Sequence, residues 1–184
     1  SQITRTMLEK SAEIFEHNNL DFSINITNHD LQDANFSNYV ELVLKEYNIK
    51  PSRLIFEILE NNSLDAIPSS RNNIARLTES GCSIALADFG AQCQNFANIL
   101  DLPLNSITID GYFIKNLKDE MSRKMVDSMV YFANNVGIDL VAEFVCDKEI
   151  YEIVNELGIK YSQGYHISEP LPALLSQDKD FSLW

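Results

Sequence analysis

Residues 83–90 read Ser-Ile-Ala-Leu-Ala-Asp-Phe-Gly, in which Ser83–Asp88 is a short, strand-like apolar run that ends in an aspartate and is followed by Phe89 and Gly90. Five similar strand-like runs occur along the chain, at Phe22–Thr27, Arg53–Ile58, Ser106–Asp110, Asp139–Glu143 and Lys160–Gln163. Segments with helical periodicity separate them, at Asn38–Tyr47, Ser69–Ser80, Ser122–Val136 and Lys148–Leu157, and glycines that can stop a helix follow several of these. This alternation predicts an α/β protein in which parallel strands are joined by crossover helices.

Each strand-like run ends in, or just before, a polar residue for which a buried strand has no structural use. These residues are Asn25, Glu57, Asp88, Asp110, Glu143 and Gln163. Parallel strands place their carboxyl ends on one face, which in a βα barrel carries the active site, so the side chains should converge. Converging carboxylates and amides predict an oxygen-rich site for Mg²⁺ or Ca²⁺. Taken singly, each residue could instead be a solvated strand end or a helix cap.

The predicted barrel is incomplete. A TIM-type barrel has eight strands and usually about 200 residues or more, whereas this chain of 184 residues offers six strand-like runs. The chain opens with a helical segment and begins with Ser1, so we expect a missing N-terminal part and a longer parent protein. Residues 1–184 should form a single domain with a C-terminal tail over residues 173–184.

An incomplete barrel would leave the strand Phe22–Thr27 without a neighbour on one side, and its core-facing residues would meet solvent. The N-terminal helix, the tail residues Phe181–Trp184 or a second copy of the chain could cover this gap. We favour a homodimer, because several hundred Å² of apolar surface is rarely left bare.

Composition excludes several classes of partner. Asp and Glu outnumber Lys and Arg by 27 to 14, for a formal net charge of −13, so electrostatic binding of nucleic acid is not expected. An anionic ligand would need a metal ion or a local cation. No run is apolar enough to predict a membrane segment. Three cysteines without a paired spacing fit a reducing, cytoplasmic location.

Six short motifs, in order, resemble those of EAL domains, the cyclic di-GMP phosphodiesterase family. Asn25 lies in a run similar to the asparagine-bearing family strand, and Glu57–Glu60 resembles E-[LI]-T-E. Four further matches are Asp88–Gly90 to DDFG, Leu102-Pro103 with Ile109-Asp110 to LP and KID, Ala142-Glu143 to AEGVE, and Gln163–Tyr165 with Pro170–Pro172 to QGY and PLP. The matched region runs from about Asp21 to Pro172.

The resemblance implies a modified TIM barrel that binds cyclic di-GMP at the carboxyl ends of its strands. In active members, two divalent metals activate a water that cleaves one phosphodiester bond to give pGpG, a chemistry suited to two-metal sites. By resemblance, Asn25, Glu57 and Asp88 would be metal ligands. Asp110 and Glu143 would be catalytic, serving the second metal and the attacking water. Gln163 would orient these groups and, with Asn25, contact the ligand.

Several positions depart from the family pattern. The first Asp of DDFG, a metal ligand, is Ala87, and the Lys of KID, which contacts the nucleophile and the phosphate, is Thr108. The Thr of E-[LI]-T-E is Leu59, the last Glu of AEGVE is Cys146, and the loop TGYSSL reads Ala91–Phe96. The EAL tripeptide itself is absent. We therefore expect a degenerate, inactive domain that regulates through protein partners. A cyclic di-GMP receptor and a weak phosphodiesterase are the alternatives.

One helix feature has two interpretations. Met121, Met125 and Met129 repeat at helical spacing. Such a stripe could form an adaptable partner surface, but core packing is the interpretation that we favour. His17, His29 and His166 share no spacing that suggests catalysis.

Overall fold

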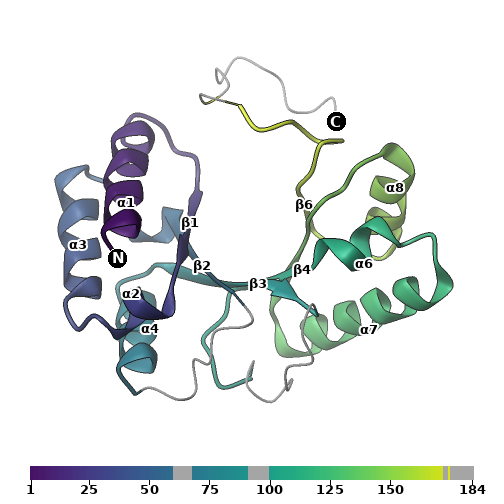
Figure 1. The fold of residues 1–184 in the computed structure, drawn as a ribbon, viewed down its shortest axis with the longest axis horizontal. Coiled ribbons are helices and arrows are strands. Elements are labelled where there is room, and N and C mark those ends of the chain that lie inside the picture. Colours follow the sequence, from purple (N-terminus) through teal and green to yellow (C-terminus); the bar gives the residue numbers. More distant parts are fainter. Residues whose placement is uncertain (60–67, 91–99, 172–173, 175–184) are drawn as a thin grey trace. The chain divides into compact units, whose positions relative to one another are not determined.

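The computed structural model describes residues 1–59, 68–90, 100–171 and 174. It divides into two compact units, Ser1–Ile107 and Thr108–Trp184. The strands follow the order β1-β2-β3-β4-β5-β6 in the sheet, and the strand pairs whose register is determined are parallel, which confirms the predicted α/β class (Figure 1). The β4 strand, Ser106–Ile109, contains the boundary between the units.

The first unit is built on three parallel strands. β1 (Phe22–Ile26), β2 (Leu54–Leu59) and β3 (Ser83–Phe89) pair in chain order. The helices are α1 (Gln2–Phe15), α2 (Asn28–Gln32), α3 (Phe36–Glu46) and α4 (Pro68–Glu79), with a 3₁₀ turn, η1 (Pro51–Arg53), before β2. Burial alternates along β1, because one face of the strand packs on helices and the other does not.

Helix α1 covers the apolar face of β1. Leu8 and Ala12 of α1 are buried in one core with Phe22 and Ile24 of β1, and the rings of Phe15 and Phe22 stack at 4.5 Å. In Figure 1, α1 and α3 lie on the same side of β1. The expectation that the core-facing residues of this strand would meet solvent is therefore wrong. The N-terminal helix shields them.

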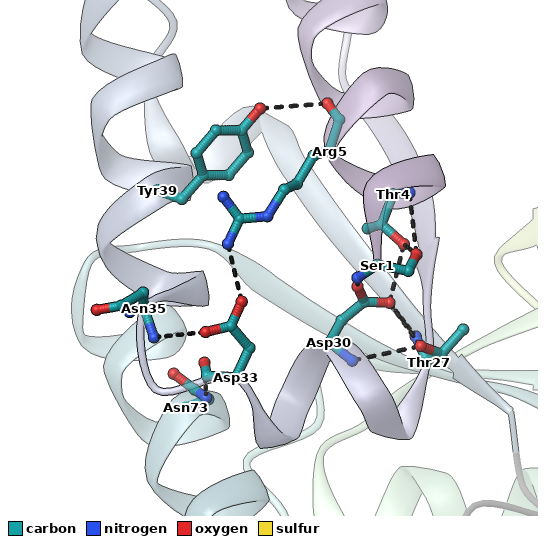
Figure 2. A network of polar contacts seen from close by, with 9 residues as sticks. All are labelled: Ser1, Thr4, Arg5, Thr27, Asp30, Asp33, Asn35, Tyr39 and Asn73. Carbon is teal, nitrogen blue, oxygen red and sulfur yellow. Dashed lines mark hydrogen bonds and ion pairs between the residues drawn. The ribbon is translucent and has the colours of Figure 1, made fainter.

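A polar network joins helices α1, α2, α3 and α4 (Figure 2). The buried Asp30 carboxylate accepts hydrogen bonds from the hydroxyls of Thr4 and Thr27, at 2.8 and 2.6 Å. Arg5 donates to Asp33 and lies over the Tyr39 ring. From α4, the Asn73 amide donates to the backbone oxygens of Leu31 and Asp33. Burial, followed by the hydrogen bond to Glu9, raises the pKa of Tyr39 to about 12.

The described part of the second unit contains three helices and two paired strands besides its part of β4. The helices are α6 (Gly111–Lys115), α7 (Glu120–Val136) and α8 (Lys148–Glu156), and the strands are β5 (Asp139–Ala142) and β6 (Tyr161–Ser162). Asp110, Asp119 and Asp147 cap the three helices with their side chains. Gly137 ends α7 at φ 74°, a left-handed conformation that favours glycine.

The predicted elements agree with the observed ones to within two residues at each end, and the structure adds the short helices α2 and α6. The preferred interpretation of the methionine stripe is wrong in part. Met129 is buried, but Met121 and Met125 are exposed. The buried face of α7 is formed by Val126, Val130 and Ala133 together with Met129.

Among the described residues, no helix is both long and apolar enough to cross a membrane.

Candidate functional site

In the first unit, β1 and β2 bring two predicted site residues together. Asn25 is the register partner of Glu57, and Glu57 is the partner of Ala85 on β3. Register partners on parallel strands share a face of the sheet, so the amide and the carboxylate lie side by side. Asn25 is exposed and Glu57 is half-buried, so both side chains remain accessible.

The next row toward the carboxyl ends of these strands is apolar. Leu59 on β2 is the register partner of Ala87 on β3, and Ala87 is buried. These are two of the positions where the sequence departs from the EAL pattern, which has Thr and Asp there. Their pairing replaces two oxygen donors in one row with methyl and isobutyl groups, which cannot coordinate a cation.

Asp88 lies just beyond this row, at the point where β3 leaves regular geometry. Its φ is 59°, a left-handed conformation that is uncommon for any residue except glycine, although Asp tolerates it better than most. Such conformations concentrate at functional sites, where the surrounding structure has to maintain them. Because of this conformation, the direction of the Asp88 side chain does not follow from the alternation of side chains along β3 alone.

A divalent cation has few ligands here. No group of three or more His, Cys, Asp or Glu side chains that could hold a metal occurs within the ranges that the structure describes. Asn25, Glu57 and Asp88 offer an amide and two carboxylates, a donor set that suits a hard cation which keeps part of its water shell. Their assignment as metal ligands stays a prediction.

In the second unit, the strand-end residue Asp110 serves as a helix cap. Its carboxylate accepts a hydrogen bond from the backbone N–H of Tyr112 at 2.7 Å, at the start of α6. Thr108, where the family has lysine, is buried in β4. The cap is the structural alternative considered for a single strand-end residue, and the catalytic role of Asp110 stays a prediction.

Glu143 and Gln163 line one pocket, of about 570 Å³. The ladder between β5 and β6 continues past the strands, because the N–H of Gln163 donates to Ala142 at 2.8 Å and the N–H of Val145 donates to Gln163 at 3.0 Å. This pairing places Gln163 beside the end of β5, where Glu143 follows. The other lining residues are Lys115, Phe144, Cys146, Gly164, Tyr165, Ser168 and Pro170.

Two glycines allow the close packing around this pocket. A Cβ on Gly111 would lie 2.2 Å from the Phe144 ring, and a Cβ on Gly164 would lie 2.2 Å from the backbone oxygen of Val145. Phe144 itself has φ 57°. Sequence reasoning missed Phe144 and Lys115 as pocket residues. The signal was present, since Phe144 occupies the position of the glycine in AEGVE, where a positive φ costs least.

The sequence matches the family described as "EAL domain" over residues 1–170. The chain belongs to the EAL domain family. The match includes α1. It therefore starts about twenty residues before Asp21, where the resemblance based on motifs begins, and it ends near Pro172, where that resemblance ends.

Several curated relatives of this EAL domain are named as cyclic di-GMP phosphodiesterases. The chain is 34% identical over 169 residues to cyclic di-GMP phosphodiesterase PdeF of Escherichia coli, covering 91% of the chain and 22% of the relative. It is 32% identical to cyclic di-GMP phosphodiesterase RocR of Pseudomonas aeruginosa, covering 89% of the chain and 41% of that protein. The chain thus spans less than half the length of either relative.

Solved structures have the same fold. The FimX EAL domain of Pseudomonas aeruginosa bound to c-di-GMP superposes with a TM-score of 0.88 at 21% identity, over 97% of this chain and 73% of that one. An EAL domain protein from Listeria monocytogenes gives 0.78 at 26% identity, over 93% and 68%. These similarities place the chain among the TIM-barrel-like EAL structures.

Proposed function

We propose that this EAL domain is a regulatory module of cyclic di-GMP signalling that does not hydrolyse the nucleotide and acts through protein partners. The observation that carries the proposal is the apolar register pair of the exposed Leu59 and the buried Ala87, together with the buried Thr108. The family has Thr, Asp and Lys at these positions. A metal ligand and the phosphate-contacting lysine are therefore both replaced.

The expected effect on rate is large. Two-metal hydrolysis depends on cations that activate the water and stabilise the charge that develops on the phosphate. Removal of one interaction of this kind often costs about 3–4 kcal/mol, or a hundred- to a thousandfold in rate. Groups that act as a unit give losses that do not simply add, but either loss alone is enough to reduce turnover to a trace.

A hydrolysis assay tests this proposal. The chain is incubated with cyclic di-GMP and Mg²⁺ or Mn²⁺, and pGpG is followed by chromatography, with RocR as the hydrolysing control. We expect no product above a trace. Turnover of about 1 per second or faster would overturn the proposal, since that is an ordinary enzymatic rate. The double variant Ala87→Asp with Thr108→Lys is not expected to restore full activity to this chain.

The pocket of the second unit favours a second candidate function, that of a cyclic di-GMP receptor. It keeps Glu143 and Gln163 in one cavity and adds a lysine and two aromatic side chains. In this candidate, the contacts to the ligand persist although the chemistry is lost. Calorimetric titration of cyclic di-GMP, with and without Mg²⁺, distinguishes a receptor from a module that acts by protein contacts alone.

A further inference from the structure

The cations of the second unit are almost all neutralised by carboxylates. Among its described residues, each lysine and arginine except Lys115 forms an ion pair: Lys118 with Glu149 and Asp147, Arg123 with Glu156, Lys124 with Glu120, Lys148 with Glu152, and Lys160 with Asp139. In a chain with a net charge of −13, neighbouring carboxylates are plentiful. Lys115 differs from the other described cations of this unit in this respect, and it lines the pocket.

Lys115 is held by an aromatic ring. Its Nζ lies 4.0 Å from the centroid of the Phe144 ring, a cation–π geometry that leaves the hydrogen-bond donors of the ammonium available. The ring lies against Gly111, which is four residues before Lys115 on the same helical face. Phe144 thus occupies the space above Gly111 and contacts Lys115 with one side chain.

This arrangement depends on an unusual backbone. Phe144 adopts φ 57°, which strongly favours glycine, and it stands at the glycine of the AEGVE motif. The strain of a bulky side chain at such a position is of the order of 1–3 kcal/mol, so the surrounding structure must compensate for it. The contacts with Gly111 and Lys115 are the compensating contacts observed.

We propose that Lys115, positioned by Phe144, is the group of this pocket that binds a phosphate of cyclic di-GMP. It would supply from helix α6 the positive charge that the family lysine supplies from the preceding strand, at the position of Thr108. The proposal rests on the receptor function proposed above. A local cation is needed because Glu143 lines the same pocket, and a carboxylate and a phosphate repel in the absence of a compensating charge.

The test is a titration of cyclic di-GMP in EDTA, so that no metal ion supplies the charge, repeated with Mg²⁺. Wild type is compared with Lys115→Gln, Lys115→Arg and the control Lys124→Gln, whose ammonium pairs with Glu120 on α7. We expect Lys115→Gln to weaken binding by about tenfold, and Lys115→Arg by less than about threefold, because Arg keeps the charge. Lys124→Gln should bind like wild type.

Salt dependence supplies a second readout. Between about 50 and 300 mM NaCl, the affinity of wild type should fall more steeply than that of Lys115→Gln, because an ammonium–phosphate contact is screened. Equal affinity and equal salt dependence of the two proteins in the buffer where wild type binds would overturn the proposal. Failure of wild type to bind in either buffer would also overturn it.

The positioning role of Phe144 is tested by Phe144→Leu, alone and combined with Lys115→Gln. Loss of the ring should weaken binding in the wild-type background but have little further effect without Lys115, since coupled residues are not additive. Additive losses would refute the positioning role. Unfolding curves of each variant identify a protein that has lost its fold. Production of pGpG would contradict the proposed absence of hydrolysis but not the phosphate contact, so the two failures are distinguishable.

Discussion

Asp30 is the residue on which the polar network of the first unit depends. Its carboxylate is fully buried and accepts from the Thr4 hydroxyl and from both the hydroxyl and the N–H of Thr27. Its own N–H and the Thr27 side chain complete a capping box at the start of α2. Removal of this acceptor would deprive the buried Thr4 hydroxyl of its hydrogen bond to the carboxylate, which costs more than the hydrogen bond itself contributes.

Asp30→Ala should therefore lower the free energy of unfolding by about 3 kcal/mol, measured by urea denaturation, because it breaks the capping box of α2 and removes the carboxylate that accepts from the buried Thr4 hydroxyl. The control is Asp33→Ala, which removes the partly exposed pair with Arg5 and should cost about 1 kcal/mol or less. Equal losses of unfolding free energy in the two variants would show that the burial of Asp30 does not determine its contribution to stability.

The vestigial metal site gives a second prediction at this scale. If Mg²⁺ or Ca²⁺ binds the chain, Glu57 and Asp88 should hold it, with Asn25 and waters completing the shell. The double variant Glu57→Gln with Asp88→Asn should lose calorimetric binding of millimolar Mg²⁺, while Asn at position 88 keeps a side chain that tolerates φ 59°. Glu41→Gln, on the outer helix α3, is the control. Binding that survives the double variant would place the cation elsewhere.

At the scale of elements, aspartate caps make two helices sensitive to acid. The hydrogen bond from the backbone of Ser122 lowers the pKa of Asp119, and that from the backbone of Ile150 lowers the pKa of Asp147. A carboxyl group whose pKa is lower in the folded state than its ordinary value of 3.8 stabilises the fold when the pH is above 3.8. This contribution is lost as the pH falls through the folded pKa.

The double variant Asp119→Asn with Asp147→Asn should therefore lose less stability than wild type between about pH 6 and pH 3, since asparagine caps without titrating. Urea denaturation at a series of pH values measures this difference. Parallel curves for the two proteins would mean that the acid sensitivity of this EAL domain arises elsewhere.

The elements themselves could largely be predicted from the sequence, because apolar runs that end in polar residues define β1, β2 and β3. The five-residue helices α2 and α6 could not, since neither is long enough to show a period, and their caps, Thr27 and Asp110, lie in runs that were assigned to strands. The role proposed for Lys115 was not predicted either. The family glycine at the position of Phe144 signals a positive φ there, but the contact between the Phe144 ring and the Lys115 ammonium is visible only in the structure.

The structure brings together two pairs of the site residues that were predicted to converge. The register of β1 and β2 places Asn25 beside Glu57, and the pairing of β5 with β6 places Glu143 and Gln163 in one pocket. Hydrophobic patterning sets register, so these neighbours could be predicted. The cap role of Asp110 depends on where α6 begins, which periodicity does not specify.

At the scale of the whole molecule, β1 remains the end strand of the sheet order, although α1 covers its apolar face. An unpaired strand edge is a template for association with another chain. We expect a concentration-dependent homodimer, detected by sedimentation velocity over about a hundredfold range of protein concentration.

The matched variant is Ser23→Pro, in which proline on the exposed, odd-numbered face of β1 removes a donor from the strand. If the dimer forms through this edge, the variant should dissociate at concentrations where Ser23→Ala does not. A compact monomer at every concentration, with the amides of β1 protected from hydrogen exchange as well as those of β2, would rule out edge pairing.

The sequential pairing of β1, β2 and β3 has a consequence for biosynthesis. Every buried residue of the first core lies between Leu8 and Ile84, and each strand pairs with the next one in the chain. During translation, domains generally fold as units, with the N-terminal one first. A segment with its own core can therefore emerge from the ribosome and fold before the second unit, which carries the pocket, has been synthesised. Substitutions at residues such as Phe56 would then act on the nascent chain, whereas those around Phe144 would act after the first unit has folded.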